Sequence, residues 1–182
     1  MPKIVEEVYY DGARERVGRL GLTPLVDEIR TVLAGFQLLV KEKKDSNGGA
    51  AVRKLIDKHF DLIGGWTKKV SGDMDWVKCK VVNGTKVCIG VEVQVSARSD
   101  LLIMDMIHLN AAFRDGRIDV GVVIVPSDKL SKFLTDRAPC MSDAKKHAKS
   151  ARLEDSSLVL VSIEHDGAGP PLVKQAKRLS AG

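Results

Sequence analysis

Apolar residues recur at helical spacing through the first third of the chain. From Leu25 onward they follow every three or four positions, after a Thr23-Pro24 pair that suits the first turn of a helix. Lysines close this pattern near position 44, and a second run of the same period covers 50–63 before two glycines. The sequence therefore predicts helices over about 23–44 and 50–63, whereas residues 1–22 show no clear pattern.

The pattern then changes to one typical of strands. Two runs rich in valine, 74–82 and 85–96, flank the dipeptide Asn83-Gly84, which is a strong signal for a two-residue hairpin turn. Such a turn pairs Val82 with Thr85. Counting back along both strands from that pair places Asp75 directly opposite Glu92.

Helix and strand patterns alternate along the rest of the chain. A helix is predicted from Ser99 to about Asp115, and the almost continuous apolar run Ile118–Val125 indicates a strand buried on both faces. Two further helices and a strand are predicted over 127–136, 143–153 and 157–163. This order predicts an α/β fold, with a mixed central sheet flanked by helices on both faces.

Length and composition fit one domain. The chain has 182 residues, of which 44% are hydrophobic and 29% are charged, so it can form a substantial core. We expect a single domain over 1–182, consisting of an N-terminal segment (1–22), a helical segment (23–63), a core (74–126) and a tail that frays (167–182).

Charge and cysteine content narrow the possible partners and compartment. The net charge of +5 and the pI near 9.1 favour a polyanionic partner. No apolar run of about 18 residues exists, and no signal peptide begins the sequence, so we expect no membrane span and a cytoplasmic location. Cys79, Cys88 and Cys140 are then expected to be free thiols. The hairpin register places Cys79 opposite Cys88, which leaves a disulfide or a soft-metal site conceivable.

The opposed carboxylates are the chemically informative feature. Asp75 and Glu92 would repel each other across the hairpin, and Gln94 lies two residues along the same face. A bound divalent cation removes that repulsion, and carboxylates are oxygen ligands that suit Mg²⁺. The alternative is that the two acids only protect an edge strand from aggregation. The valines that alternate with Glu92 and Gln94 argue against it, because they indicate an interior strand.

These residues also resemble a known motif. Asp75 followed by Glu92-Val93-Gln94 resembles the PD-(D/E)xK nuclease motif in its Glu-x-Gln variant, which is typical of the BglII-like type II restriction endonucleases. The segment Gly116–Pro126 is similar to that family's core, and Gly64-Gly65-Trp66 also fits. The resemblance covers about residues 50–130.

The resemblance implies a restriction-endonuclease-like fold and a catalytic role for the 74–126 core. It implies a sequence-specific homodimer that encloses double-stranded DNA and cuts both strands with Mg²⁺, for which Mn²⁺ substitutes. Asp75 and Glu92 would bind the metal, with the Val93 carbonyl as a third ligand. Gln94 replaces the commoner lysine, and a neutral amide positions the attacking water rather than deprotonating it. Asp73 is an alternative first acid.

Other readings remain open. Ser96, Arg98 and Ser99 precede a predicted helix and could bind the DNA backbone, although an ordinary helix cap explains them equally well. The basic stretch 145–152 is more simply a solvated face. The alternatives for the whole chain are a non-catalytic DNA-binding module, a nuclease of another role such as repair, and a structural domain without a nucleic-acid partner.

Overall fold

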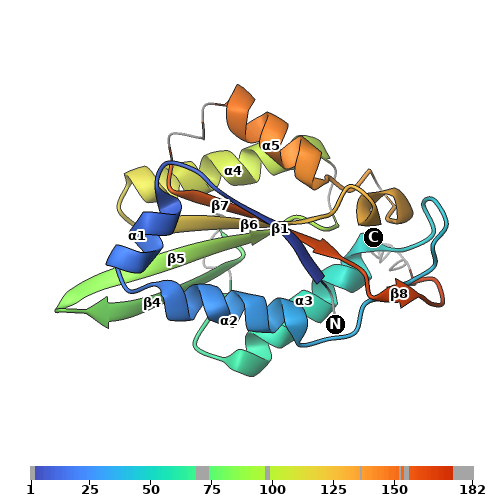
Figure 1. The fold of residues 1–182 in the computed structure, drawn as a ribbon, viewed down its shortest axis with the longest axis horizontal. Coiled ribbons are helices and arrows are strands. Elements are labelled where there is room, and N and C mark those ends of the chain that lie inside the picture. The colour runs from blue at the N-terminus through green and yellow to red at the C-terminus, as the bar shows by residue number, and fades with distance from the viewer. Residues whose placement is uncertain are drawn as a thin grey trace, which may run out of the picture.

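A mixed β-sheet runs through the centre of the computed structural model (Figure 1), which describes residues 3–68, 74–96, 99–135, 137–151, 153 and 156–173. Within these residues the main sheet has 6 strands. In spatial order they are β1 (Lys3–Tyr9), β7 (Leu158–Glu164), β6 (Val120–Pro126), β5 (Thr85–Val93), β4 (Trp76–Val82) and β3 (Thr67–Lys68). The strands β5, β6 and β7 are parallel to one another, and the outer strands pair antiparallel. The predicted mixed sheet is confirmed.

Helices cover both faces of this sheet, as predicted (Figure 1). One apolar core lies between the sheet and the first three helices, and a second core lies between the sheet and the last two. The helices are α1 (Ala13–Arg19), α2 (Thr23–Ala34) and α3 (Gly49–Ile63) on one face, and α4 (Ser99–Arg114) and α5 (Met141–Ser150) on the other. Strand β6 is buried along its whole length because both of its faces are covered.

The β4–β5 hairpin has the register that the sequence predicts. Asn83 and Gly84 both have positive φ, 50° and 79°, as a two-residue turn between strands of natural twist requires. Val82 pairs with Thr85, and the ladder continues to the pair Trp76–Val91. The turn chemistry alone therefore determines which residues face each other at the far end of the hairpin.

The expectation of free thiols at Cys79 and Cys88 is wrong, because a disulfide joins them. The two residues pair directly across β4 and β5, and their Cα atoms are 4.0 Å apart. Antiparallel strands approach this closely at pairs that exchange no backbone hydrogen bonds, and there two thiols come within bonding distance. Cys140 remains a free thiol.

The first predicted helix is too long. Helix α2 ends at Ala34, and the chain continues into β2 (Leu39–Val40). Phe36, Leu38 and Val40 are buried while the residues between them are more exposed. This alternation is the two-residue period of a strand, but Phe36 and Leu39 also fit the spacing of the preceding helix, so the sequence pattern did not show it. Its partner is β8 (Gly167–Ala168), so the predicted tail begins in ordered structure.

Two other predictions need correction. Residues 1–22, which show no clear sequence pattern, contain β1 and α1. The predicted helix over 127–136 is reduced to one 3₁₀ turn, η1 (Leu130–Phe133). The Ser127 hydroxyl accepts the Leu130 N–H at the start of this turn, and it also donates to Glu164. The turn ends before Leu134, whose backbone is extended with φ −83° and ψ 153°.

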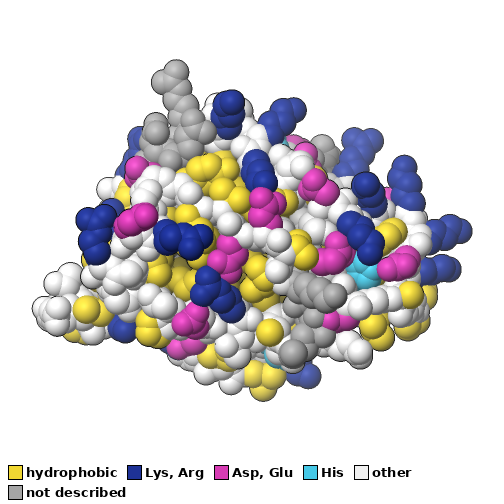
Figure 2. All heavy atoms as spheres, in the orientation of Figure 1, with side chains coloured by type: hydrophobic (Ala, Val, Ile, Leu, Met, Phe, Trp, Pro, Cys, Tyr) yellow, Lys and Arg dark blue, Asp and Glu magenta, His cyan; other side chains and the backbone are white. Residues whose placement is uncertain are grey.

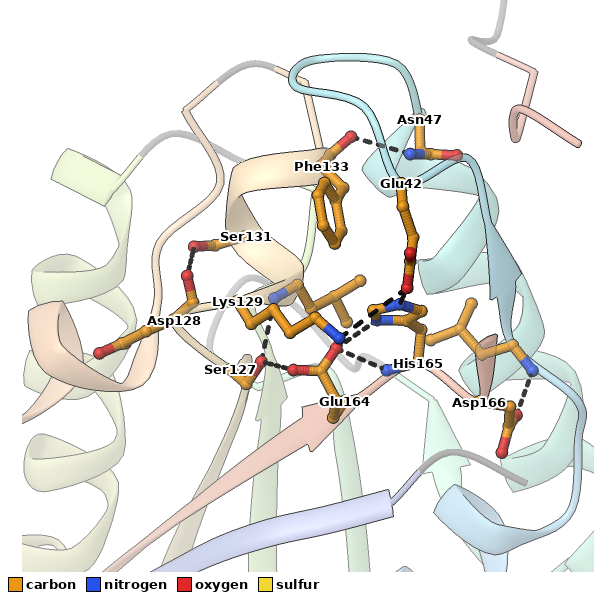
Figure 3. A network of polar contacts seen from close by, with 12 residues as sticks. Glu42, Asn47, Ser127, Asp128, Lys129, Ser131, Phe133, Glu164, His165 and Asp166 are labelled. Atoms are coloured by element: carbon orange, nitrogen blue, oxygen red, sulfur yellow. Dashed lines mark hydrogen bonds and ion pairs between the residues drawn. The ribbon is translucent and has the colours of Figure 1, made fainter. Parts of the chain in front are cut away.

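A network of hydrogen bonds attaches the loop between β2 and α3 to the rest of the protein (Figure 3). His165 is buried between two carboxylates: its Nε2 lies 2.7 Å from Glu42, and its Nδ1 contacts Glu164. The fully buried Asn47 amide bonds the backbone of Lys41 and Phe133. These contacts tie the loop to the carboxyl ends of β6 and β7, and so determine where α3 begins.

Charged groups are dispersed over the visible surface. In Figure 2, Lys and Arg side chains lie around the whole of that face and alternate with Asp and Glu side chains. No helix among the described residues has the length and apolar character needed to cross a membrane.

Candidate active site

A cleft of about 360 Å³ opens beside the carboxyl end of β5. Four segments contribute side chains to it: α3, the residues just before β4, the end of β5 with its continuation, and α4. The lining residues are Arg53, Met74, Asp75, Glu92, Val93, Gln94, Ser96, Leu101, Met104, Asp105 and His108. The three residues Asp75, Glu92 and Gln94 that the sequence singles out therefore border one cleft.

Asp75 and Glu92 face each other at the open end of the β4–β5 hairpin. The Asp75 N–H donates to the Val91 carbonyl at 3.1 Å, just beyond Trp76–Val91, the last pair of the regular ladder. The Val93 N–H donates to Asp75 Oδ2 at 2.8 Å, and the Asp75 and Glu92 side chains are hydrogen-bonded to each other. The predicted register thus brings the two acids into direct contact.

The two acids differ in protonation. Burial, the hydrogen bond to Asp75 and the charges of Asp75 and Asp105 raise the pKa of Glu92 to about 10. Burial also acts to raise the pKa of Asp75, but hydrogen bonds with Arg53 and Glu92 outweigh it, and the pKa of Asp75 lies below its usual value. At neutral pH one proton is therefore shared by the pair and held on Glu92.

Arg53 is a site residue that the sequence analysis missed. It extends from α3, and its Nη2 lies 2.7 Å from Asp75 Oδ1 while its Nη1 donates to the Val93 carbonyl at 2.8 Å. Its Nε donates to Asp57 Oδ1 at 2.9 Å, one helical turn further along. The Arg53–Asp57 pair at helical spacing is visible in the sequence, but only the packing of α3 against β5 shows that it reaches the acids.

Asp105 is the second missed residue. It lies between Met104 and Met106 on helix α4, and the Gln94 amide nitrogen donates to its Oδ2. Gln94 is 6% exposed, and its backbone N–H donates to Ile124 on β6. The Gln94 amide nitrogen is therefore turned toward Asp105, and the amide oxygen on its other side is turned away from Asp105. An acid among apolar helical neighbours was the available signal.

The remaining predicted site residues are only partly placed. Ser96 lines the cleft. Ser99 is the first residue of α4, and only its backbone is described. Asp73 and Arg98 lie outside the described residues.

The donor set fits a hard divalent cation. The candidate donors are the Asp75 and Glu92 carboxylates and the Val93 carbonyl, all oxygens of the kind that Mg²⁺ and Mn²⁺ prefer. In the described ranges, no group of three or more His, Cys, Asp or Glu side chains is arranged to hold a metal ion. Mg²⁺ keeps several water molecules and binds through one or two carboxylates, so these residues suit a partly hydrated ion.

A family model described as restriction endonuclease BglII/BglIII matches residues 16–177, a span that contains every residue of the cleft. No curated protein matches the chain. The mixed sheet with helices on both faces also agrees with a restriction-endonuclease-like fold.

Proposed function

Since the chain belongs to the BglII/BglIII restriction endonuclease family, and is therefore a type II site-specific deoxyribonuclease, we propose that it cuts double-stranded DNA at one defined sequence with Mg²⁺. The proposed metal ligands are Asp75, Glu92 and the Val93 carbonyl. The single observation that supports this most is the buried contact between Asp75 and Glu92, because two acids that share one proton form a site that a cation stabilises.

Each residue has a separate task in this proposal. Bound Mg²⁺ would lower the pKa of the attacking water and offset charge on the phosphoryl group. Gln94 presents its amide oxygen to the cleft and orients the water by accepting a hydrogen bond, while Asp105 holds the amide in that orientation. Ser96, together with Arg98 before α4 and Ser99 at its first position, would contact the DNA backbone.

We further propose a homodimer, in which each copy cuts one strand. Helix α4 supports this assembly, because Leu101, Met104 and Ile107 expose 48%, 46% and 40% of their surfaces at helical spacing. A two-fold arrangement would pair this stripe with the same stripe of a second copy. Because Leu101 and Met104 also line the cleft, this pairing would place the two clefts next to the dimer interface. Light scattering should give twice the monomer mass, and a monomer in both the free and the DNA-bound protein would contradict the dimer.

Plasmid cleavage tests the proposed chemistry. Wild-type protein with Mg²⁺ should convert supercoiled plasmid into discrete linear fragments, and the same result is expected with Mn²⁺. EDTA should abolish the reaction. Glu92→Gln, which keeps the shape but cannot ionise to bind a cation, should lower the rate by about 10³-fold or more, because the cation loses a ligand.

Four outcomes would count against the proposal. Cleavage that persists in EDTA would exclude a metal mechanism. Full activity of Glu92→Gln would exclude this site, and a smear without discrete fragments would exclude a defined recognition sequence. DNA binding without any cutting would favour the non-catalytic alternative, and the salt dependence of that binding would measure how many phosphates are contacted.

A further inference from the structure

The guanidinium of Arg53 occupies the space between two of the proposed metal ligands. Its Nη2 lies 2.7 Å from Asp75 Oδ1, and its Nη1 lies 2.8 Å from the Val93 carbonyl oxygen. The side chain is mostly shielded from water, with 20% of its surface exposed. One positive group therefore contacts two of the three residues proposed to bind a divalent cation.

We propose that Arg53 is a built-in counter-ion that takes the place of the metal in the metal-free protein and competes with it. This inference rests on the proposed function, because it assumes that Asp75 and Val93 bind the cation. In the metal-free state Arg53 neutralises Asp75 and keeps the acid aligned with β5. When a cation binds, the terminal nitrogens of Arg53 give up at least one of these contacts, because two positive charges repel at such short range.

The surroundings of Arg53 allow such an exchange. The Asp57 carboxylate accepts a hydrogen bond from Arg53 Nε, and it also accepts hydrogen bonds from Trp76 Nε1 at 3.1 Å and from Lys68 Nζ at 3.0 Å. The anchor does not involve the metal ligands, so the terminal nitrogens can move while the rest of the side chain stays in place. The open cleft on which Arg53 borders gives those nitrogens room.

A merely structural ion pair would behave differently. If Arg53 only supported Asp75, removing it would leave a buried carboxylate misplaced, and cation affinity would fall or stay the same. If Arg53 competes with the cation, replacing it exposes two metal ligands and removes the competing positive charge, so cation affinity rises. The direction of the change therefore separates the two roles.

Manganese binding without DNA provides the test, measured from the electron paramagnetic resonance signal of free Mn²⁺. Arg53→Met should bind Mn²⁺ about tenfold more tightly than wild type, because the competing charge is gone. Arg53→Lys keeps the charge but cannot bridge both oxygens, so its affinity should lie between the two. Arg30→Met removes an arginine that pairs with Glu7 on β1, and it should leave Mn²⁺ affinity unchanged.

Thermal unfolding gives a second readout that does not depend on cleavage. Arg53→Met should melt below wild type in EDTA, and saturating Mn²⁺ should raise its melting temperature more than it raises that of wild type. Should Arg53→Met fail to fold, Arg53→Lys carries the comparison alone.

The result also separates this inference from the proposed function. Unchanged or weaker Mn²⁺ binding in both Arg53 variants would overturn the counter-ion role while leaving the metal site intact. Glu92→Gln should lose Mn²⁺ binding in the wild-type and Arg53→Met backgrounds alike. If it binds Mn²⁺ as wild type does, the metal site itself is wrong.

Discussion

Gly49 packs directly against the backbone of Val95. A Cβ atom at position 49 would approach the Val95 carbonyl oxygen closer than any real contact allows, and it would lie 2.8 Å from Ser96 Cα. The first residue of α3 therefore touches the segment that continues β5 into the cleft. This contact links the helix that carries Arg53 to the strand that carries Glu92 and Gln94.

The first prediction concerns this contact. Gly49→Ala should force α3 away from Val95, lower the free energy of unfolding by about 1–3 kcal/mol, and reduce cleavage by about 10²-fold because the site groups lose their alignment. Urea unfolding and plasmid cleavage measure the two effects. Gly18→Ala in α1 is the matched control: nothing lies within 4 Å of its Cβ position, so stability should hold or rise slightly. Equal behaviour of the two variants would refute the packing argument.

Asp105 should act through Gln94. Asp105→Asn replaces a side chain that only accepts hydrogen bonds with one that can also donate, so position 105 no longer fixes which way the Gln94 amide turns. We expect kcat to fall by about 10- to 100-fold, as for other groups that position a catalytic residue. KM for DNA should change little, since Asp105 is not proposed to bind the substrate.

A double variant isolates this coupling. Gln94→Ala should lower the rate on its own, and adding Asp105→Asn to it should cost little more, because the amide to be oriented is already absent. Independent, additive losses would show that Asp105 has a role apart from Gln94.

The disulfide is expected to be structural. Unfolded, unreduced protein should show one reactive thiol, Cys140, and reduced protein should show three. Replacing Cys79 and Cys88 with alanine should lower stability by about 2–3 kcal/mol at most, because the closed loop is short. Cleavage should be unchanged, since neither residue lines the cleft. Three reactive thiols without reductant would contradict the bond.

The sequence predicts best where local chemistry determines geometry. Asn83-Gly84 specifies a two-residue turn, and the turn specifies every pair down to Trp76 and Val91, so the contact between Asp75 and Glu92 follows from counting. The unbroken apolar run of β6 also predicts its position, because a strand with no polar side is one that is buried on both faces. These features define the centre of the sheet and half of the candidate site.

The rest depends on packing that no local pattern encodes. Strands β2 and β8 have two residues each, too few to establish a period, and their paired residues are 128 positions apart in the chain. Arg53 and Asp105 lie on helices from opposite faces of the sheet, and they meet Asp75 and Gln94 only because of how those helices dock. A sequence shows the residue types in such a site but not which helices deliver them.

The ion pair between Glu7 and Arg30 gives the last prediction, a pH dependence of stability. Arg30 on α2 donates Nε and Nη2 to the two carboxylate oxygens of Glu7 on β1, at 2.9 Å and 2.7 Å, and this bonding lowers the pKa of Glu7 below 4.5. A carboxyl whose pKa is lowered by folding stabilises the protein above its unfolded pKa, and this stabilisation is lost as the pH falls through the folded pKa. Glu7→Gln should therefore destabilise the protein by about 1 kcal/mol at pH 7, and the difference from wild type should shrink steadily below about pH 4.5. Urea unfolding of both proteins across this range measures the difference, with Arg30→Lys as a variant that keeps the charge but not the paired hydrogen bonds. A gap between wild type and Glu7→Gln that widens toward low pH would have the wrong sign and would show that the pair does not hold α2 to β1.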